Sequence, residues 1–368
     1  MKTPTVASLT TMQFIFLISG FQISVSFLAL PRQLSNAAGT DGWAAILIDW
    51  AVSTLVSLVI VKIMQKSPEG TVLDLLSRRI GKWAGNLAAV VFGLYFLSLA
   101  YDGLVRSVLV TKVWLLTETP VYIILALFLL PVYTIGKGGP VILGRYSEFV
   151  LLVTFWMLFI YLAPLKEAHW LHLLPFPKSG LMPIFYAVKN IIFSFLGFAI
   201  VLFLYPNLKH KQYAVRGVVI SNAVTAFVYL WVTLICFIYF SPDEIQEINQ
   251  PIITMLKTVE FRFIERIEIP FISLYLFSYS LLWIPAAYLT VYCSSWLLES
   301  DNAARHLQIV CTLLVVVSYF YFPSFNHSEK FEASVGAVGG IVEYVFPACL
   351  LPMLALREKV KRKGSLQG

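Results

Sequence analysis

The chain has 368 residues, of which 59% are hydrophobic, 15% are aromatic and only 13% are charged. An average soluble domain is about 25% charged and 45–50% apolar, so this composition excludes a soluble globular protein and a disordered one. The net charge of +7 does not indicate a nucleic-acid partner, because the basic residues are dispersed between apolar runs and form no patch. The sequence therefore predicts an all-α polytopic membrane protein.

Ten apolar runs are long enough to cross a bilayer, which requires about 20 residues. We expect membrane-spanning helices over about 10–30, 43–63, 83–111, 119–136, 145–164, 183–205, 213–240, 268–298, 304–322 and 337–356. The first run has no small-residue cleavage site and is predicted to be a span, not a removed signal peptide. The expected organisation is one transmembrane domain over 1–368, ending in a basic tail at 357–368.

The distribution of basic residues predicts the orientation of the spans. Ten spans place both termini on one side of the membrane. With the termini in the cytoplasm, the inner segments carry 17 Lys and Arg residues and the outer segments carry 8. Basic residues favour the cytoplasmic side, so both termini are predicted to be cytoplasmic.

Two amphipathic segments occupy corresponding positions in the two halves of the chain. Residues 71–74 (Thr-Val-Leu-Asp) have the pattern of a capping box, and they predict a short helix through Ile80 on the cytoplasmic face. Apolar residues at three- and four-residue intervals between Ile245 and Phe263 predict an interfacial helix on the outer face. Each segment follows the second span of its half, which indicates two five-span repeats over about 10–164 and 183–356.

The first span of each half contains small and polar residues at mid-depth. They occur between Ser19 and Ser26, and in the second half at Asn190 and between Phe193 and Gly197. Glycine and hydroxyl residues allow a helix to unwind, and paired interruptions are typical of inverted-repeat transporters with a ligand site at the membrane midplane. Small residues also favour close helix packing. The matched interfacial segments favour broken helices in spans 1 and 6.

Short motifs close to the ends of the spans resemble those of a known family. They are Leu28-Ala29-Leu30-Pro31-Arg32, Asp41-Gly42-Trp43, Gly81-Lys82-Trp83-Ala84-Gly85, Thr119-Pro120, Gly144-Arg145-Tyr146-Ser147-Glu148, Phe195-Leu196-Gly197, Leu204-Tyr205-Pro206-Asn207-Leu208 and Glu265-Arg266-Ile267-Glu268. Their order over most of the chain resembles the B subunit of spore germinant receptors, the GerAB family of the amino acid/polyamine/organocation permease superfamily. The resemblance implies a ten-helix, LeuT-like, 5+5 inverted-repeat subunit in the inner membrane of a bacterial spore. Such a subunit binds a nutrient germinant, often an amino acid, and works with A and C receptor subunits.

The interruptions predict a ligand site at mid-membrane. Unwinding of spans 1 and 6 would expose backbone N–H groups suited to a carboxylate, and serine hydroxyls or carbonyls suited to an ammonium group. The candidate residues in spans 1 and 6 are Gly20, Gln22, Ser24, Ser26, Ser194, Phe195, Leu196, Gly197 and Phe198. The family fold, and not the residue pattern, adds Tyr95, Leu99, Leu282 and Trp283. Family members often have Gly-x-Gly where this chain has Ser24-Val25-Ser26, so the serines would narrow the approach of a carboxylate.

A charged residue inside a membrane span costs free energy to insert, so each one is expected to have a structural or functional role. Asp102 and Arg106 are spaced i,i+4 and share a helix face, so they can form a structural ion pair or have a gating role. Lys189 either extends to the membrane surface or lies in the cavity, and we favour the cavity. Asp49, Glu148 and Glu343 have no assignable partners, and Glu148 is close to a span boundary.

The sequence contains no motif that indicates an enzyme. It has no nucleophile–base pattern, phosphate loop, cofactor motif or metal signature, and its four cysteines lie within apolar runs. Two functions remain open: a ligand-gated receptor subunit, and a secondary amino-acid transporter coupled to protons through Lys189 or Asp102. A subunit that opens a water or ion path on binding its ligand would combine them.

Overall fold

Helices form the regular structure of the described residues, which in this computed structural model are 8–178, 180–258, 267–300 and 302–364. The α-helices are α1 (Thr11–Ser26), α2 (Leu30–Ala38), α3 (Trp43–Met64), α4 (Val72–Arg79), α5 (Lys82–Trp114), α6 (Val121–Gly136), α7 (Gly139–Thr154), α8 (Met157–Ile160), α9 (Leu181–Ile191), α10 (Val201–Leu204), α11 (Ala214–Tyr239), α12 (Glu244–Glu247), α13 (Pro251–Lys257), α14 (Glu268–Leu297), α15 (Ala303–Phe320), α16 (Phe325–Gly339) and α17 (Phe346–Gly364). The 3₁₀ turns are η1 (Gly39–Gly42), η2 (Ala163–Glu167), η3 (Trp170–Leu173), η4 (Ile192–Phe195), η5 (Phe198–Ile200), η6 (Tyr205–Asn207) and η7 (Lys211–Tyr213), and η8 (Gly340–Val345) is a π-helical turn.

The predicted spans are present as apolar helices. Within the described residues, seven helical stretches are long and apolar enough to cross a membrane, and the bent pair 181–189 and 192–207 makes an eighth. The shorter apolar helices α1 and α6 match the first and fourth predicted spans. The expectation of an all-α polytopic membrane protein is therefore confirmed.

Two predicted span boundaries are wrong. Span 1 was expected to run to about residue 30, but α1 ends at Ser26, and Pro31 lies in the first turn of α2, where proline needs no backbone donor and favours helix. Span 10 was expected to begin near residue 337, whereas α16 begins at Phe325. Polar residues in α16 gave its sequence the appearance of a loop. Ser328 is buried and Glu332 pairs with Arg106 of α5, whereas the polar residues at 326, 327, 329, 330 and 334 are exposed.

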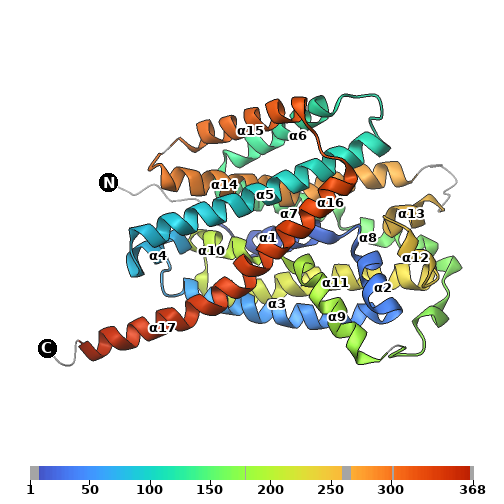
Figure 1. Cartoon of the computed structure of the whole chain (residues 1–368), viewed down its shortest axis with the longest axis horizontal. Coiled ribbons are helices and arrows are strands. Elements are labelled where there is room, and N and C mark those ends of the chain that lie inside the picture. Colours follow the sequence, from blue (N-terminus) through green and yellow to red (C-terminus); the bar gives the residue numbers. More distant parts are fainter. Residues whose placement is uncertain (1–7, 179, 259–266, 301, 365–368) are drawn as a thin grey trace.

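The short helices outside the spans lie at opposite ends of the molecule. Figure 1 places α4 and the end of α17 at one end of the bundle, and α12 and α13 at the other. The capping box expected at Thr71 and Asp74 is present, because each residue bonds the other's backbone N–H group. The predicted second segment is two short helices, α12 and α13, and its residues 259–263 lie outside the described residues. The expectation that the two segments lie on opposite faces agrees with this arrangement.

Spans 3 and 8 form the centre of the bundle. The helices α5 and α14 pack along each other, and α1 packs against α7, α11 and α14 (Figure 1). The elements of span 6 lie beside α1 and α3, while α16, η8 and α17 pass across them. This packing places the interruption of span 6 among helices from both halves of the chain.

Candidate functional site

Span 6 is broken at Leu196 and Gly197, as the sequence predicts. Leu196 is extended, with φ −57° and ψ 151°, and Gly197 has φ +125°. A side chain is disfavoured at that φ, and a Cβ atom on Gly197 would also lie 2.6 Å from Cδ1 of Phe21. The span is also bent by 48° earlier in the chain, between 181–189 and 192–207. The break leaves backbone groups that a continuous helix would have paired.

Span 1 breaks later than its sequence predicts. The helix α1 continues through Ser26, and the turn falls at residues 27–29 before α2. The hydroxyls of Ser19 and Ser24 donate to the carbonyls of Ile15 and Gly20, four residues back, so both serines are accommodated within the helix. Gly20 serves packing instead of unwinding, because a Cβ atom there would lie 2.5 Å from Cδ1 of Leu281. Ser26 is buried in the last turn of α1.

Gln22 bonds to the backbone exposed by the break. Its side chain has no exposed surface, and its Nε2 donates to the carbonyl of Phe195 at 3.0 Å and to Oδ1 of Asn222 at 3.0 Å. The hydroxyl of Thr225 donates to Oε1 of Gln22 at 2.9 Å. The hydroxyl of Tyr229 lies 2.9 Å from the carbonyl of Ser194, to which it donates. Spans 1 and 7 thus satisfy the carbonyls before the break, through residues of α11 that the sequence did not indicate.

Glu343 bonds to the other side of the break. It has no exposed surface, and its Oε2 accepts from the backbone N–H groups of Gly197 at 2.8 Å and Ala199 at 3.1 Å. Its Oε1 accepts from the hydroxyl of Tyr95 at 2.6 Å. The expectation that a ligand carboxylate meets free N–H groups here is therefore wrong for this conformation. The chain fills that position with its own carboxylate.

Glu343 lies in the π-helical turn η8, which brings its carboxylate to span 6. A π-turn adds a residue to a helix and is common at functional sites. In η8, Tyr344 as well as Glu343 reaches span 6, because its hydroxyl donates to the carbonyl of Ile192 at 3.0 Å and lies 2.8 Å from the hydroxyl of Ser53. Asp49 is fully buried beside this group, with Oδ1 3.4 Å from the Tyr344 hydroxyl. Adjacent residues of span 10 therefore hold both sides of the break.

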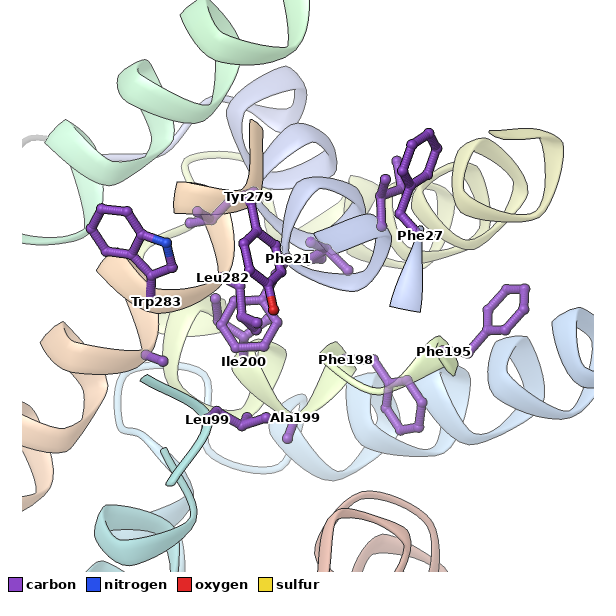
Figure 2. Close-up of a cluster of buried hydrophobic side chains, with 14 of the residues drawn as sticks. Phe21, Phe27, Leu99, Phe195, Phe198, Ala199, Ile200, Tyr279, Leu282 and Trp283 are labelled. Atoms are coloured by element: carbon purple, nitrogen blue, oxygen red, sulfur yellow. The ribbon is translucent and has the colours of Figure 1, made fainter. Parts of the chain in front are cut away.

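The predicted apolar residues are all buried, but they do not converge on one point. In Figure 2, Phe195 and Phe198 point to different sides of span 6, where they contact the rings of Tyr229 and Tyr344. Leu99 and Leu282 belong to the same buried cluster as Ala199 and Ile200 of span 6, whereas Trp283 points away from the break (Figure 2). Trp283 donates to the hydroxyl of Ser107 and packs on Phe128, so it joins α14 to α5 and α6.

The predicted ionisable residues do not gather at the break. Arg106 forms an ion pair with Glu332 of α16, so the pairing expected with Asp102 is wrong. Asp102 is buried, and among the described residues its Oδ1 has no hydrogen-bond partner. Lys189 is exposed on the surface of the protein, which contradicts its placement in the cavity and agrees with extension toward the membrane surface. Glu148 accepts a bond from Gln13.

Sequence comparison identifies the family of this chain. A family model described as spore germination protein matches residues 8–330. The chain belongs to this family. Spore germination protein GerQB of Bacillus cereus is 25% identical over 350 residues, which cover 95% of each chain. Spore germination protein YndE of Bacillus subtilis is 25% identical and covers 98% of this chain and 99% of its own.

Solved structures identify the fold. The nucleobase-cation-symport family transporter Mhp1 aligns with a TM-score of 0.62 at 12% identity, covering 92% of this chain and 78% of its own. MhsT in complex with L-phenylalanine aligns with a TM-score of 0.56 at 14% identity, covering 92% and 89%. At such identities the likeness concerns fold alone. This spore germination protein has a LeuT-like fold, as its sequence predicts.

Proposed function

We propose that this chain is the B subunit of a spore nutrient germinant receptor. It would bind a small nutrient, in the first instance an amino acid, beside the break in span 6. The observation that carries the proposal is the set of bonds on both sides of the break. Side chains of spans 1, 7 and 10 bond to the backbone there, and Tyr95 of span 3 bonds to the span 10 carboxylate. The family match and the transporter fold support it.

The bonds around the break suggest how binding becomes a signal. Phe21, Phe195 and Phe198 have no exposed surface, so a nutrient needs a shift of the surrounding helices to enter. A ligand shifts such an equilibrium only by binding one arrangement more tightly than the other. Because spans 1 and 7 bond to carbonyls before the break and span 10 bonds to N–H groups after it, a nutrient that replaces one of these bonds loosens the contact with that span. A and C receptor subunits would receive this movement in the inner membrane of the spore, with both termini of the chain in the cytoplasm.

Replacing Gly197 by alanine tests the site. The new Cβ atom would meet Phe21 at 2.6 Å, and the φ of +125° would be strained, so the break should shift. We expect spores carrying Gly197→Ala to need at least about tenfold more of a mixture of twenty amino acids and glucose for half-maximal germination, a change of about 1.4 kcal/mol.

Gly180→Ala is the matched control, because Gly180 has φ +83° but no atom within 4 Å of a new Cβ. It should germinate like the wild type at equal protein level. An unchanged response of Gly197→Ala, with the protein present in the spore membrane, would remove the site from the break.

A proton-coupled amino-acid transporter is the alternative function. In that case the proton route would pass through the buried Asp102, whose Oδ1 has no partner among the described residues, and not through the exposed Lys189. Vesicles containing only this chain would then accumulate labelled amino acid when a proton gradient is imposed. Retained binding without uptake would dismiss the alternative.

A further inference from the structure

Glu343 is a buried acid whose bonding is incomplete. A carboxylate has about four lone-pair positions, and Glu343 uses two on Oε2 and one on Oε1. All three donors are uncharged groups, two backbone N–H groups and the hydroxyl of Tyr95. Removing a carboxylate from water is costly unless such bonds replace the lost hydration. Glu343 is therefore held as an acceptor. Among the bonds of the described residues, Oε1 accepts from Tyr95 alone, which leaves a lone pair for one more donor.

The packing of span 10 fixes Glu343 at the break. A Cβ atom on Gly339 would lie 2.4 Å from Cδ1 of Leu196 and 2.9 Å from the hydroxyl of Tyr95. A Cβ atom on Gly340 would lie 3.0 Å from Cε1 of Phe193. The two glycines thus let the backbone of span 10 approach span 6 at the start of the π-turn. The position of Glu343 is built into the contact between these spans and does not depend on a flexible side chain.

This arrangement restricts which group of a nutrient can meet span 6. An amino acid carboxylate placed on the N–H groups of Gly197 and Ala199 would compete with Glu343 for the same donors, and the two anions would repel each other. A donor group placed beside Oε1 would instead complete the bonding of Glu343. An ammonium group would also supply the positive charge that its three neighbours lack.

We propose that Glu343 is a specificity-determining residue: it takes the place of a ligand carboxylate on Gly197 and Ala199 and accepts the ammonium or hydroxyl group of the nutrient. The proposal rests on the proposed function for the identity of the ligand. Its structural part, a carboxylate position that the chain itself fills, can be tested without any nutrient.

Chemical rescue tests that structural part. Glu343→Ala, purified as the full chain in detergent, should melt below the wild type because three donors lose their acceptor. Acetate should enter the space and raise the Tm of this variant toward that of the wild type, because a ligand that binds only the folded state stabilises it. Acetamide should not, and acetate should leave the wild type and Glu148→Ala unchanged. Equal effects of acetate and acetamide, or of acetate on both alanine variants, would overturn the proposal.

Small cations test the acceptor role, with a variant that keeps the shape of the side chain. Ethylammonium chloride should raise the Tm of the wild type more than sodium propionate at the same concentration. Glu343→Gln should abolish that difference, whereas Glu148→Gln should keep it. The proposal is wrong if propionate stabilises the wild type as much as ethylammonium does, or if Glu343→Gln keeps the difference. This arm also decides the matter if Glu343→Ala does not fold.

Spores separate failure of this inference from failure of the proposed function. Half-maximal germination on the mixture of amino acids and glucose should need at least tenfold more nutrient in Glu343→Gln than in the wild type, and no more in Glu148→Gln. Acetate rescue without any nutrient response, in a strain whose only receptor contains this chain, would contradict the proposed function alone. A normal response of Glu343→Gln would contradict the role of Glu343 alone.

Discussion

Gln22 shows what a single buried polar side chain does in this fold. It joins the carbonyl of Phe195 to Asn222 and Thr225, so one residue of α1 connects span 6 to span 7. A polar side chain within an apolar span can be recognised from sequence alone, and Gln22 was a candidate site residue for that reason. Its partners carried none, since hydroxyl and amide residues on α11 are equally typical of ordinary helix packing.

Gln22→Leu tests this role. Leucine has a similar size but leaves the carbonyl of Phe195 and Oδ1 of Asn222 without this donor, whereas the hydroxyl of Thr225 keeps a second acceptor. Each unsatisfied buried group costs about 1–3 kcal/mol. We expect the free energy of unfolding to fall by about 2 kcal/mol, measured by thermal unfolding of the purified protein. Gln308→Leu, which removes an exposed bond to Tyr133, should have little effect. Equal Tm values for the two variants would contradict the account.

The bond between Glu343 and Gly197 could not be predicted from the sequence, although the break at Gly197 could. Gly197 could be predicted, because a glycine among aromatic and hydroxyl residues inside an apolar run indicates a break. The acid that bonds it lies 146 residues later in the chain, so only the folded arrangement brings the two together. The glycines at 339 and 340 immediately before an intramembrane acid were the available signal of close approach.

At the scale of elements, the pair of Arg106 and Glu332 joins α5 to α16. The sequence predicted that Arg106 shares a helix face with Asp102, but a shared face does not decide which residue of another helix lies opposite. Glu332 was assigned to a loop because α16 is polar at its start. The π-turn was equally hidden, since nothing in the residues 340–345 distinguishes it from a regular helical turn.

Arg106→Gln should destabilise the protein by about 3 kcal/mol, because it leaves the carboxylate of the largely buried Glu332 unpaired. The double variant Arg106→Gln, Glu332→Gln should recover most of the loss, since it removes the uncompensated charge as well. Thermal unfolding of the three proteins in one detergent measures the effect. A double variant no more stable than Arg106→Gln would show that the pair does not join the helices.

The whole molecule was the most predictable scale. Apolar runs, interfacial segments and paired interruptions follow from the physics of the bilayer, which allows only helices and requires their broken parts to lie inside protein. These features indicated an inverted-repeat transporter fold, and the family resemblance implied the LeuT-like arrangement that the solved structures identify. The contacts of each broken helix were not predictable, because they depend on how spans far apart in the sequence meet around span 6.

A structure of the receptor determined with its nutrient bound tests the central claim most directly. The account predicts nutrient density beside Leu196 and Gly197, with a donor group of the nutrient within hydrogen-bond distance of Glu343, and helices around the break shifted relative to the arrangement described here. Nutrient density bound elsewhere in the receptor, with the bonds of Gln22 and Glu343 to span 6 unchanged, would contradict it.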